Sequence, residues 1–260
     1  MLYQVASNAQ EASIDGIKSL PDSALNAFAG GSRVSGGLAE KAYRAIREAI
    51  QEGRVSPGQR VPELELCAWL TMSRTPVREA LRRLQSDGML VHAAGGGLAV
   101  AQHDLRAVAE LYEVRESLEG TAAALAARNG DETEVHILQA MLDSHRHLPD
   151  DPKVHARENA LFHEYIYRAA RNRFLLKSLQ DLHDAVALLG RTTFAAPGRI
   201  NEAWSEHEAI VAAIHRHDAA EAEGLARAHV RRGYQLRLAA IAEATQAGPQ
   251  TRIEQSLRIT

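Results

Sequence analysis

The sequence predicts a mostly α-helical chain in which an N-terminal winged helix-turn-helix is followed by an all-α helical bundle. Apolar residues recur with the helix period from Leu38, two short apolar runs flank the glycine turn of "MLVHAAGGGLAVA", and helical patterning continues almost without interruption beyond Asp104. A length of 260 residues exceeds the commonest domain size, so two domains are expected. The chain is accordingly divided into four expected segments: a disordered lead (1–37), a winged helix-turn-helix (38–101), a helical effector-binding and dimerisation domain (105–245) and a flexible tail (246–260).

Composition excludes several classes of protein. The 45% hydrophobic and 24% charged residues are ordinary for a globular protein. No apolar run approaches the roughly 20 residues that cross a bilayer, and the first residues lack the basic and apolar regions of a signal peptide. Cys67 is the only cysteine, which excludes an internal disulfide and a cysteine-rich zinc site. We therefore expect a cytoplasmic protein with no membrane partner.

The net charge of −3 is unevenly distributed along the chain. Residues 38–101 carry nine Lys and Arg against seven Asp and Glu, whereas residues 102–260 carry nineteen against twenty-three. A slightly basic module therefore precedes an acidic one. This charge distribution is compatible with DNA binding by the first module but is not sufficient to predict it. The lead before them is polar, and "AGGSRVSGG" at 29–37 is typical of a flexible linker. Only a short helix near 23–28 is expected there.

Two helices open the first module. Leu38 and every fourth residue up to Ile50 are apolar, which places them on one face of a helix. The turn residues of "SPGQRVP" end this helix. A second, short helix follows, with Leu66 and Leu70 pointing inward.

The third helix and a hairpin complete the winged helix-turn-helix. In "SRTPVREALRRL", Ser73 is placed to cap the helix, and Pro76 lies in the first turn, where its missing N–H costs nothing. Gly88 is a stop signal, and "MLVHAAGGGLAVA" reads as strand, glycine turn and strand. The residues expected to point inward at helical spacing are Val77, Leu81 and Leu84.

The N-terminal end of this third helix is the candidate DNA reader. In a helix-turn-helix that end reaches the base edges, and arginine binds guanine through two parallel hydrogen bonds. Hydroxyl groups and the helix N-terminus attract phosphate, and a glycine-rich wing can approach the minor groove. The residues assigned to this surface are Ser73, Arg74, Thr75, Arg78, Arg82 and Arg83 on the helix, with His92 to Gly97, including Gly96, in the wing. The alternative is a solvated helix face that merely carries arginines.

The second module is expected to contain only helices. Breaks fall at "RNGDE", "LPDDP" and "FAAPGR", and no strand pattern appears. Asp131 with Glu134, and Asp218 with Glu221, have the spacing of a capping box. Six helices in roughly 140 residues make a compact bundle. Their expected ranges are 105–128, 132–147, 154–170, 173–190, 202–217 and 219–245.

Three histidines lie on apolar stripes of three different helices. His163 shares its face with Asn159, one turn earlier, and His207 and His229 lie on corresponding faces of later helices. Burying an imidazole is costly without a partner, and three imidazoles can share a metal ion. The alternative is that each is a hydrogen-bonded core histidine. His145 and His183 also lie near apolar stripes, so periodicity alone does not select the set.

A charged pair interrupts the stripe of the first bundle helix. Leu111 and Leu118 belong to a heptad-like apolar stripe, and Arg115 occupies the position between them, with Glu119 one turn further on. A charge on a core stripe is expected only with a partner. One interpretation is an internal Arg–Glu pair, and the other is a pocket in which Arg115, beside Glu119, binds an anion.

The first module resembles the DNA-binding domain of the GntR family of bacterial transcription regulators. The resemblance rests on "VPELELCAWLTMSRTPVREALRRLQSDGMLVHAAGGGLAV", including Glu63 and the whole block 73–81. It implies DNA contacts by Arg74, Thr75 and Arg78, with Glu63 and the wing in support. The departures from the usual pattern, which affect the turn and the core rather than the reading face, are Cys67, Thr71 and Met72.

The second module resembles the effector domain (FCD domain) of the FadR subfamily, with its short helical form similar to the VanR-like branch. The resemblance rests on "LYEVRESLEGTAAALAARNG", "NALFHEYIYRAARNRFL", "WSEHEAIVAAI" and "AEGLARAHVRRG". It implies that one divalent metal, with zinc first and nickel or manganese as alternatives, is bound by Asn159, His163, His207 and His229. Asn159 replaces the more usual Asp, which weakens the site for a cation and favours an anionic effector.

Together these observations predict a ligand-responsive transcription regulator rather than an enzyme. It is expected to act as a repressor, as a homodimer on a palindromic operator in double-stranded DNA. The expected effector is a small organic acid, whose carboxylate is held by the metal and Arg115. Two other interpretations stay open: a metal-dependent hydrolase, because three histidines and an open position resemble a hydrolytic zinc site, and a metal-free regulator that binds a larger acyl ligand.

Overall fold

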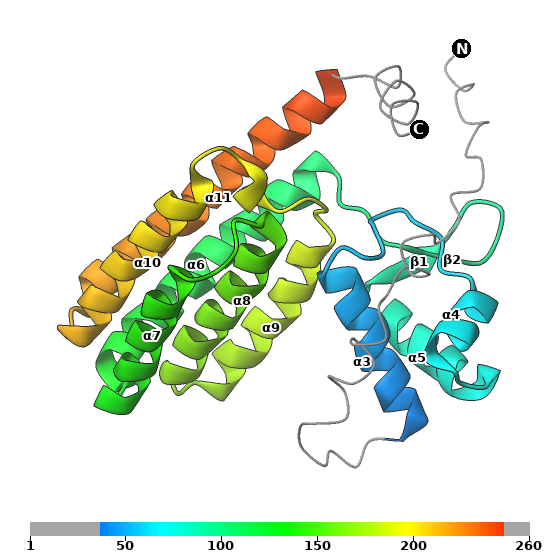
Figure 1. Cartoon of the computed structure of the whole chain (residues 1–260), viewed down its shortest axis with the longest axis horizontal. Coiled ribbons are helices and arrows are strands. Elements are labelled where there is room, and N and C mark those ends of the chain that lie inside the picture. The colour runs from blue at the N-terminus through cyan, green and yellow to red at the C-terminus, as the bar shows by residue number, and fades with distance from the viewer. Residues whose placement is uncertain (1–36, 247–260) are drawn as a thin grey trace. The chain divides into compact units, whose positions relative to one another are not determined.

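The computed structural model describes residues 37–246 as two compact units (Figure 1). The first unit runs as far as Asp104 and also includes residues 184–190, and the second unit contains the helices between and after these segments. The disordered lead, the short helix near 23–28 and the flexible tail that we expected all lie outside the described residues.

The first unit is a winged helix-turn-helix, as the sequence predicts. Its two strands are antiparallel, with Leu90 opposite Val100 and His92 opposite Leu98. The elements, in chain order, are α3 (Leu38–Gln51), α4 (Glu63–Leu70), α5 (Arg74–Ser86), β1 (Leu90–His92) and β2 (Leu98–Val100).

The core of the first unit is formed by the predicted apolar faces and by one residue from far along the chain. Ile46, Leu66 and Leu84 are fully buried in it, whereas Leu38, expected on the same face as Ile46, is 57% exposed. Leu188 is also part of this core. The sequence pattern assigned all of 173–190 to the bundle, because periodicity shows that a helix has a buried face without showing what that face contacts.

A left-handed residue forms the turn between α4 and α5. Thr71 is the C-cap of α4, with φ +52° and ψ +44°. Thr71 is one of the departures from the usual pattern noted in the sequence, and glycine is the residue that adopts such a conformation without strain. A β-branched side chain at positive φ is unusual, so Thr71 is locally strained.

The second unit is helical throughout, apart from short connections. The capping box at Asp131 is confirmed: its side chain accepts from the Glu134 amide and Glu134 accepts from the Asp131 amide, both at 3.0 Å. Asp218 likewise accepts from the Glu221 amide at 3.0 Å. The elements are α6 (Leu105–Asn129), α7 (Glu132–His145), α8 (Pro152–Ala169), α9 (Arg173–Ala187), the 3-10 helix η2 (Thr193–Ala195), α10 (Arg199–His215) and α11 (Ala219–Gln246).

Two of these helices begin earlier than the apolar periodicity indicated. Asp151 caps α8 by accepting from the Lys153 amide at 2.8 Å, and Pro152 occupies the first position, where proline is favoured. Gly198, with φ +75°, starts α10 at Arg199 rather than at 202. The first turns carry polar residues, so their start depends on cap chemistry rather than on hydrophobic pattern.

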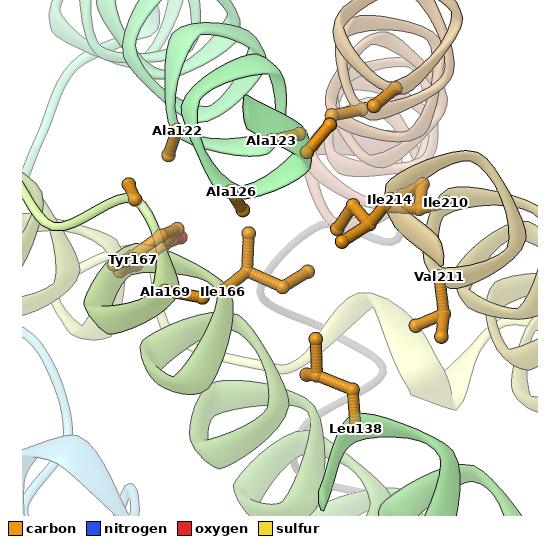
Figure 2. Packing of buried hydrophobic residues seen from close by; sticks show 14 of the residues in the cluster. Ala122, Ala123, Ala126, Leu138, Ile166, Tyr167, Ala169, Ile210, Val211 and Ile214 are labelled. Atoms are coloured by element: carbon orange, nitrogen blue, oxygen red, sulfur yellow. The ribbon is translucent and has the colours of Figure 1, made fainter. Parts of the chain in front are cut away.

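Small residues let the helices of the second unit approach closely. Figure 2 shows Ala123 and Ala126 of α6 near Ile166 of α8 and Ile214 of α10 in one buried cluster. A side chain at Gly120 of α6 would meet Arg227 of α11, whose Cγ lies 2.7 Å from the position that a Cβ would occupy. Such close packing holds α8, α10 and α11 in fixed positions around α6. Within the described residues no helix is long and apolar enough to cross a membrane.

Candidate DNA-binding surface and candidate metal centre

The start of α5 presents the predicted reading residues at the surface. Ser73 and Thr75 are exposed, and the side chains of Arg74 and Arg78 are 61% and 55% exposed. The opposite face of α5 is buried in the core through Val77 and its neighbours. The helix is therefore fixed by one face while its N-terminal end remains available to a partner.

Ser73 is the N-cap residue of α5, but its side chain makes no capping hydrogen bond. The expected cap is therefore wrong in this detail. The backbone N–H groups at the start of α5 therefore receive no capping bond from Ser73. Unpaired N–H groups at a helix start are the groups that bind phosphate.

Glu63 of α4 orients the two candidate reading arginines. Its carboxylate accepts a hydrogen bond from Arg78 Nε at 2.7 Å, and Arg74 Nε lies 4.0 Å from its other oxygen. Exposed pairs of this kind contribute little to stability. Their effect is to restrict where the guanidinium groups point, and the supporting role of Glu63 in DNA binding stays a prediction.

The two later arginines of α5 differ in their surroundings. Arg83 donates to Glu40 at 2.5 Å and lies over the ring of Tyr43, 3.9 Å from its centroid, so it holds α5 against α3. The expectation that Arg83 reaches the DNA backbone does not fit these contacts. Arg82 is exposed and has no ion-pair partner among residues 37–246.

The wing is stiffened by an arginine that the sequence analysis did not single out. Arg60 donates to the backbone carbonyls of Ala94, at 2.5 Å, and Gly96, at 3.0 Å. Gly96 and its two glycine neighbours have positive φ angles between +79° and +94°, and His92 at the end of β1 is exposed. Arg60 forms an isolated antiparallel bridge with Ala99 outside the predicted elements, so only the structure could show that it holds the wing tip.

Three buried histidines converge inside the second unit. His163 from α8, His207 from α10 and His229 from α11 each offer a ring nitrogen, and these nitrogens all lie within 4.8 Å of one another. The three side chains are 7%, 0% and 7% exposed. The helices bring together three of the four predicted ligands, which the apolar pattern alone could not select from His145 and His183.

Polar atoms of His207, and of Asn159 one turn before His163 on α8, have no partner. Both ring nitrogens of His207 and the Oδ1 atom of Asn159 are buried without a hydrogen bond. An unpaired buried polar atom costs about 1–3 kcal/mol, so this arrangement is unfavourable unless something binds there. Burial lowers the pKa of His163 to about 3 and the pKa of His207 well below its usual value, so both rings are neutral and able to donate a lone pair.

The distance between two of the rings fits a shared ion. His163 Nε2 lies 3.2 Å from His229 Nε2. Two nitrogens bound tetrahedrally to one zinc ion, at about 2.0–2.1 Å each, are about 3.4 Å apart. The three imidazoles therefore fit a divalent metal in chemistry, and the His163–His229 pair also fits one in spacing.

Arg115 and Glu119 form the buried pair that was one of the two interpretations of their pattern. Arg115 Nε donates to Glu119 at 2.8 Å, and the guanidinium lies over the Tyr112 ring at 4.8 Å. Burial opposes ionisation of Glu119, but the charge of Arg115 lowers its pKa to about 2. Among the described residues, the two terminal nitrogens of Arg115 have no hydrogen-bond partner.

Two further charged residues beside the cluster were missed by the sequence analysis. Glu206 accepts from His229 Nδ1 at 2.6 Å, and Arg199, only 3% exposed, donates to Glu206 at 2.9 Å. Arg199 belongs to "FAAPGR", which reads as a loop, and Glu206 lies between core positions of its helix. The one available signal was the proximity of Glu206 to His207 in sequence.

A separate cavity of about 700 Å³ opens in the second unit between the end of α7 and the starts of α8 and α10. His155 lines it and accepts a hydrogen bond from Trp204 Nε1 at 3.1 Å. The Trp204 ring also contacts the His207 ring, with centroids 5.0 Å apart. Trp204 therefore touches both the cavity wall and the histidine cluster, and His145 stacks on it at 4.5 Å.

Both units match known families. Residues 38–100 match the family described as bacterial regulatory proteins, gntR family, and residues 110–232 match the FCD domain. The two matches cover the described winged helix-turn-helix and most of the helical unit.

The curated relatives are transcription regulators. The chain is 31% identical over 184 residues to a probable D-xylose utilization operon transcriptional repressor of Paenarthrobacter nicotinovorans, covering 70% of this chain and 80% of the relative. It is 29% identical over 173 residues to the uncharacterized HTH-type transcriptional regulator YdhC of Bacillus subtilis, covering 65% and 76%. The solved structure of E. coli McbR/YncC shares the fold, with a TM-score of 0.72, 23% identity and coverage of 79% and 99%.

Proposed function

Because this chain belongs to the gntR family of bacterial regulatory proteins, it is a DNA-binding transcription regulator, and we propose that a metal-bound small carboxylate controls it. The winged helix-turn-helix reads the operator and the FCD domain senses the effector. The relatives are regulators and not enzymes, so the three histidines serve binding rather than hydrolysis.

For DNA binding, the support is the exposed start of α5. Arg74 and Arg78 would contact base edges in the major groove, while Ser73, Thr75 and Arg82 would bind phosphates. His92 and Gly96 of the wing would lie at the minor groove. A homodimer would place two α5 helices about one DNA turn, roughly 34 Å, apart on a palindromic operator. Repression is the mode that we infer, as in the D-xylose relative.

For the sensor, the observation that carries the proposal is the convergence of three buried imidazoles, one of which, His207, has no hydrogen-bond partner at either ring nitrogen. His163, His207 and His229 would supply nitrogen ligands, and the unpaired Oδ1 of Asn159 would supply an oxygen. Bound zinc would provide a Lewis-acidic position for an anionic group; nickel and manganese suit the same donors less specifically.

The charge of this site favours an anionic effector. All four proposed ligands are neutral, and the carboxylates nearby are already paired with arginines. The metal would therefore keep its positive charge within the unit. The two free terminal nitrogens of Arg115 match a carboxylate, which they can bind through two parallel hydrogen bonds.

The test combines metal analysis with thermal unfolding. The purified full chain should contain one zinc per chain, and His163→Ala should reduce this content to well below one. Small mono- and dicarboxylic acids should raise the melting temperature of the zinc-loaded protein only, because a ligand that binds the folded state stabilises it by mass action. A chain that binds no divalent metal, at any concentration used, would contradict the proposed metal centre.

The cavity beside Trp204 supports the second interpretation, a regulator that binds a larger acyl ligand without metal. Its volume of about 700 Å³ is adequate for a ligand of drug-like size. Trp204 fluorescence would distinguish the metal-bound carboxylate from the metal-free larger ligand. A ligand that changes this fluorescence equally with and without zinc would support binding in the cavity without metal. Trp69, the other tryptophan, would be replaced by Phe for this measurement.

A further inference from the structure

Two of the three clustered histidines are each backed by a carboxylate. His163 Nδ1 lies 3.3 Å from a Glu119 oxygen, and His229 Nδ1 lies 2.6 Å from a Glu206 oxygen. An ionised carboxylate only accepts hydrogen bonds, so the hydrogen-bonded Nδ1 of His229 must carry the proton, and a proton on Nδ1 of His163 would face the otherwise unpaired Glu119 oxygen. The neutral ring then has its free lone pair on Nε2.

The same two rings turn their Nε2 atoms toward each other. These atoms are 3.2 Å apart, and with both protons on Nδ1 no hydrogen bond can form between them. Two lone pairs at this separation repel. The carboxylates therefore hold the rings in the one tautomer and orientation that suits a shared cation.

Glu206 is itself fixed by a buried arginine. Arg199 is 3% exposed, and its Nη1 lies 2.9 Å from Glu206 and 3.3 Å from Glu202. Arg199 Nη2 also lies 3.5 Å from His229 Nδ1, but the carboxylate contact of 2.6 Å is much shorter and therefore determines the tautomer. A fully buried guanidinium needs such a partner, so Glu206 cannot turn away from it without cost.

We infer that Glu206, held by Arg199, is a positioning residue that presents Nε2 of His229 to the metal, and that Glu119, held by Arg115, does the same for His163. This inference rests on the proposed metal centre. Each carboxylate makes its histidine a stronger ligand, and each arginine cancels the carboxylate's charge. The arrangement thus strengthens the metal–nitrogen bonds while leaving the positive charge of the metal for an anion.

Glu206 gives the sharper test of the two, because Glu119 is almost fully buried and its variants risk unfolding. In Glu206→Gln, the amide oxygen should turn to Arg199, which can only donate. The NH2 group then faces His229 and requires Nδ1 to accept, which moves the ring proton to Nε2 and removes the ligand lone pair. The matched control is Glu202→Gln, one turn earlier on α10, which also contacts Arg199 and does not contact His229.

Zinc affinity of the full chain is measured by competition with a chromophoric chelator. Glu206→Gln should bind zinc about 10–100-fold more weakly than the natural chain, the usual effect of losing such an outer partner. Glu202→Gln should bind it within about threefold of the natural chain. Glu206→Asp, which keeps a carboxylate, should restore part of the loss.

Two readouts separate positioning from a merely structural role. Nitrogen-15 shifts of the imidazole rings should show a protonated Nδ1 on His229 in the natural chain without zinc, and not in Glu206→Gln. The melting temperature without zinc reports the structural effect alone. If Glu206→Gln lowers that temperature but binds zinc as tightly as the natural chain, the inference is wrong although the metal centre stands. If the natural chain binds no zinc, the metal centre and this inference both fail.

Discussion

At the scale of single residues, the turn between α4 and α5 stores strain. Thr71 has φ +52° and is exposed, so it gains little from packing. Thr71→Gly should relieve roughly 1–2 kcal/mol of left-handed strain and cost roughly 0.5–1 kcal/mol of extra unfolded-state entropy. We expect a net gain of about 0.5–1 kcal/mol in the free energy of unfolding, measured with urea. A loss of stability would show that the Thr71 side chain contributes contacts that outweigh its strain.

We predict that Arg78 contacts a base of the operator. Arg78→Ala should weaken operator binding by about 1–3 kcal/mol if the guanidinium binds guanine in a bidentate manner. The melting temperature should hardly change, because the side chain is 55% exposed and its pair with Glu63 is a surface pair. Affinity is measured on a duplex selected from random DNA by the natural chain.

Lys41→Ala is the control for this measurement, since it removes one exposed positive charge of α3 without touching α5. It should weaken binding to all duplexes slightly and equally. Operator affinity that is the same for Arg78→Ala and the natural chain would refute base reading by Arg78.

Single residues also show where sequence reasoning ends. The proposed ligands His163, His207 and His229 came from the family resemblance, since periodicity alone could not distinguish them from His145 and His183. Glu206 and Arg199 were not found at all. Their roles depend on contacts between α10 and α11, and the sequence pattern does not show which faces of two helices are in contact.

At the scale of elements, α3 and α5 are joined by a hydrogen bond and a stacked arginine. Tyr43 of α3 donates to Asp87, the C-cap residue of α5, at 2.7 Å. Burial, and then the hydrogen bond to Asp87, raise the pKa of Tyr43 to about 12. The folded state therefore favours the neutral phenol.

This bond predicts a pH dependence at the alkaline end. Because the pKa is raised from 10.0 to about 12, the stabilisation is complete below pH 10 and disappears as the pH rises to about 12. Tyr43→Phe should lower the free energy of unfolding at pH 8 by about 0.5–1.5 kcal/mol and remove this alkaline step. The measurement is urea unfolding between pH 8 and 12, with the exposed Tyr165→Phe as control. An unchanged alkaline step in Tyr43→Phe would assign it to other groups.

Elements were the most predictable level of the fold. The three helices and the hairpin of the first unit, and the six long helices of the second, follow from apolar periodicity, glycines and caps. The starts of α8 and α10 were placed late because Pro152 and Gly198 act through backbone geometry rather than hydrophobicity. The inclusion of residues 184–190 in the first unit was not predicted, because an apolar helix face does not show which residues it packs against.

At the scale of the whole molecule, the proposal requires that effector binding in one unit changes operator affinity. Arg115→Ala would leave the buried Glu119 carboxylate unpaired and risk unfolding, so Arg115→Lys is the better variant. Lysine keeps a positive charge beside Glu119 but loses the planar fork that binds a carboxylate twice. Without effector, operator affinity should be unchanged. The effector concentration for half-release should rise about tenfold, the equivalent of about 1.4 kcal/mol.

The control for this measurement is Arg106→Lys, an exposed arginine of the same helix that pairs only with Glu110 in the described chain. It should leave both operator affinity and release unchanged. Fluorescence anisotropy of labelled operator, titrated with the carboxylate found by thermal shift, provides both quantities. Normal release by Arg115→Lys would show that Arg115 serves only as the partner of Glu119.

The inclusion of residues 184–190 in the first unit bears on how such proteins can evolve by exchanging parts. Leu188 is 5% exposed within that unit, and Asp184 accepts from Arg47 at 2.9 Å and from Gln51 at 2.6 Å. A gene fusion that joined residues 38–101 to a foreign sensor would inherit an unfilled hole in the core and two polar groups without their acceptor. Recombination at this junction would therefore destabilise the DNA-binding unit. That unit must be inherited together with a short segment encoded more than eighty residues downstream, within the sensor. Inheritance of both units together is therefore favoured over their separate exchange.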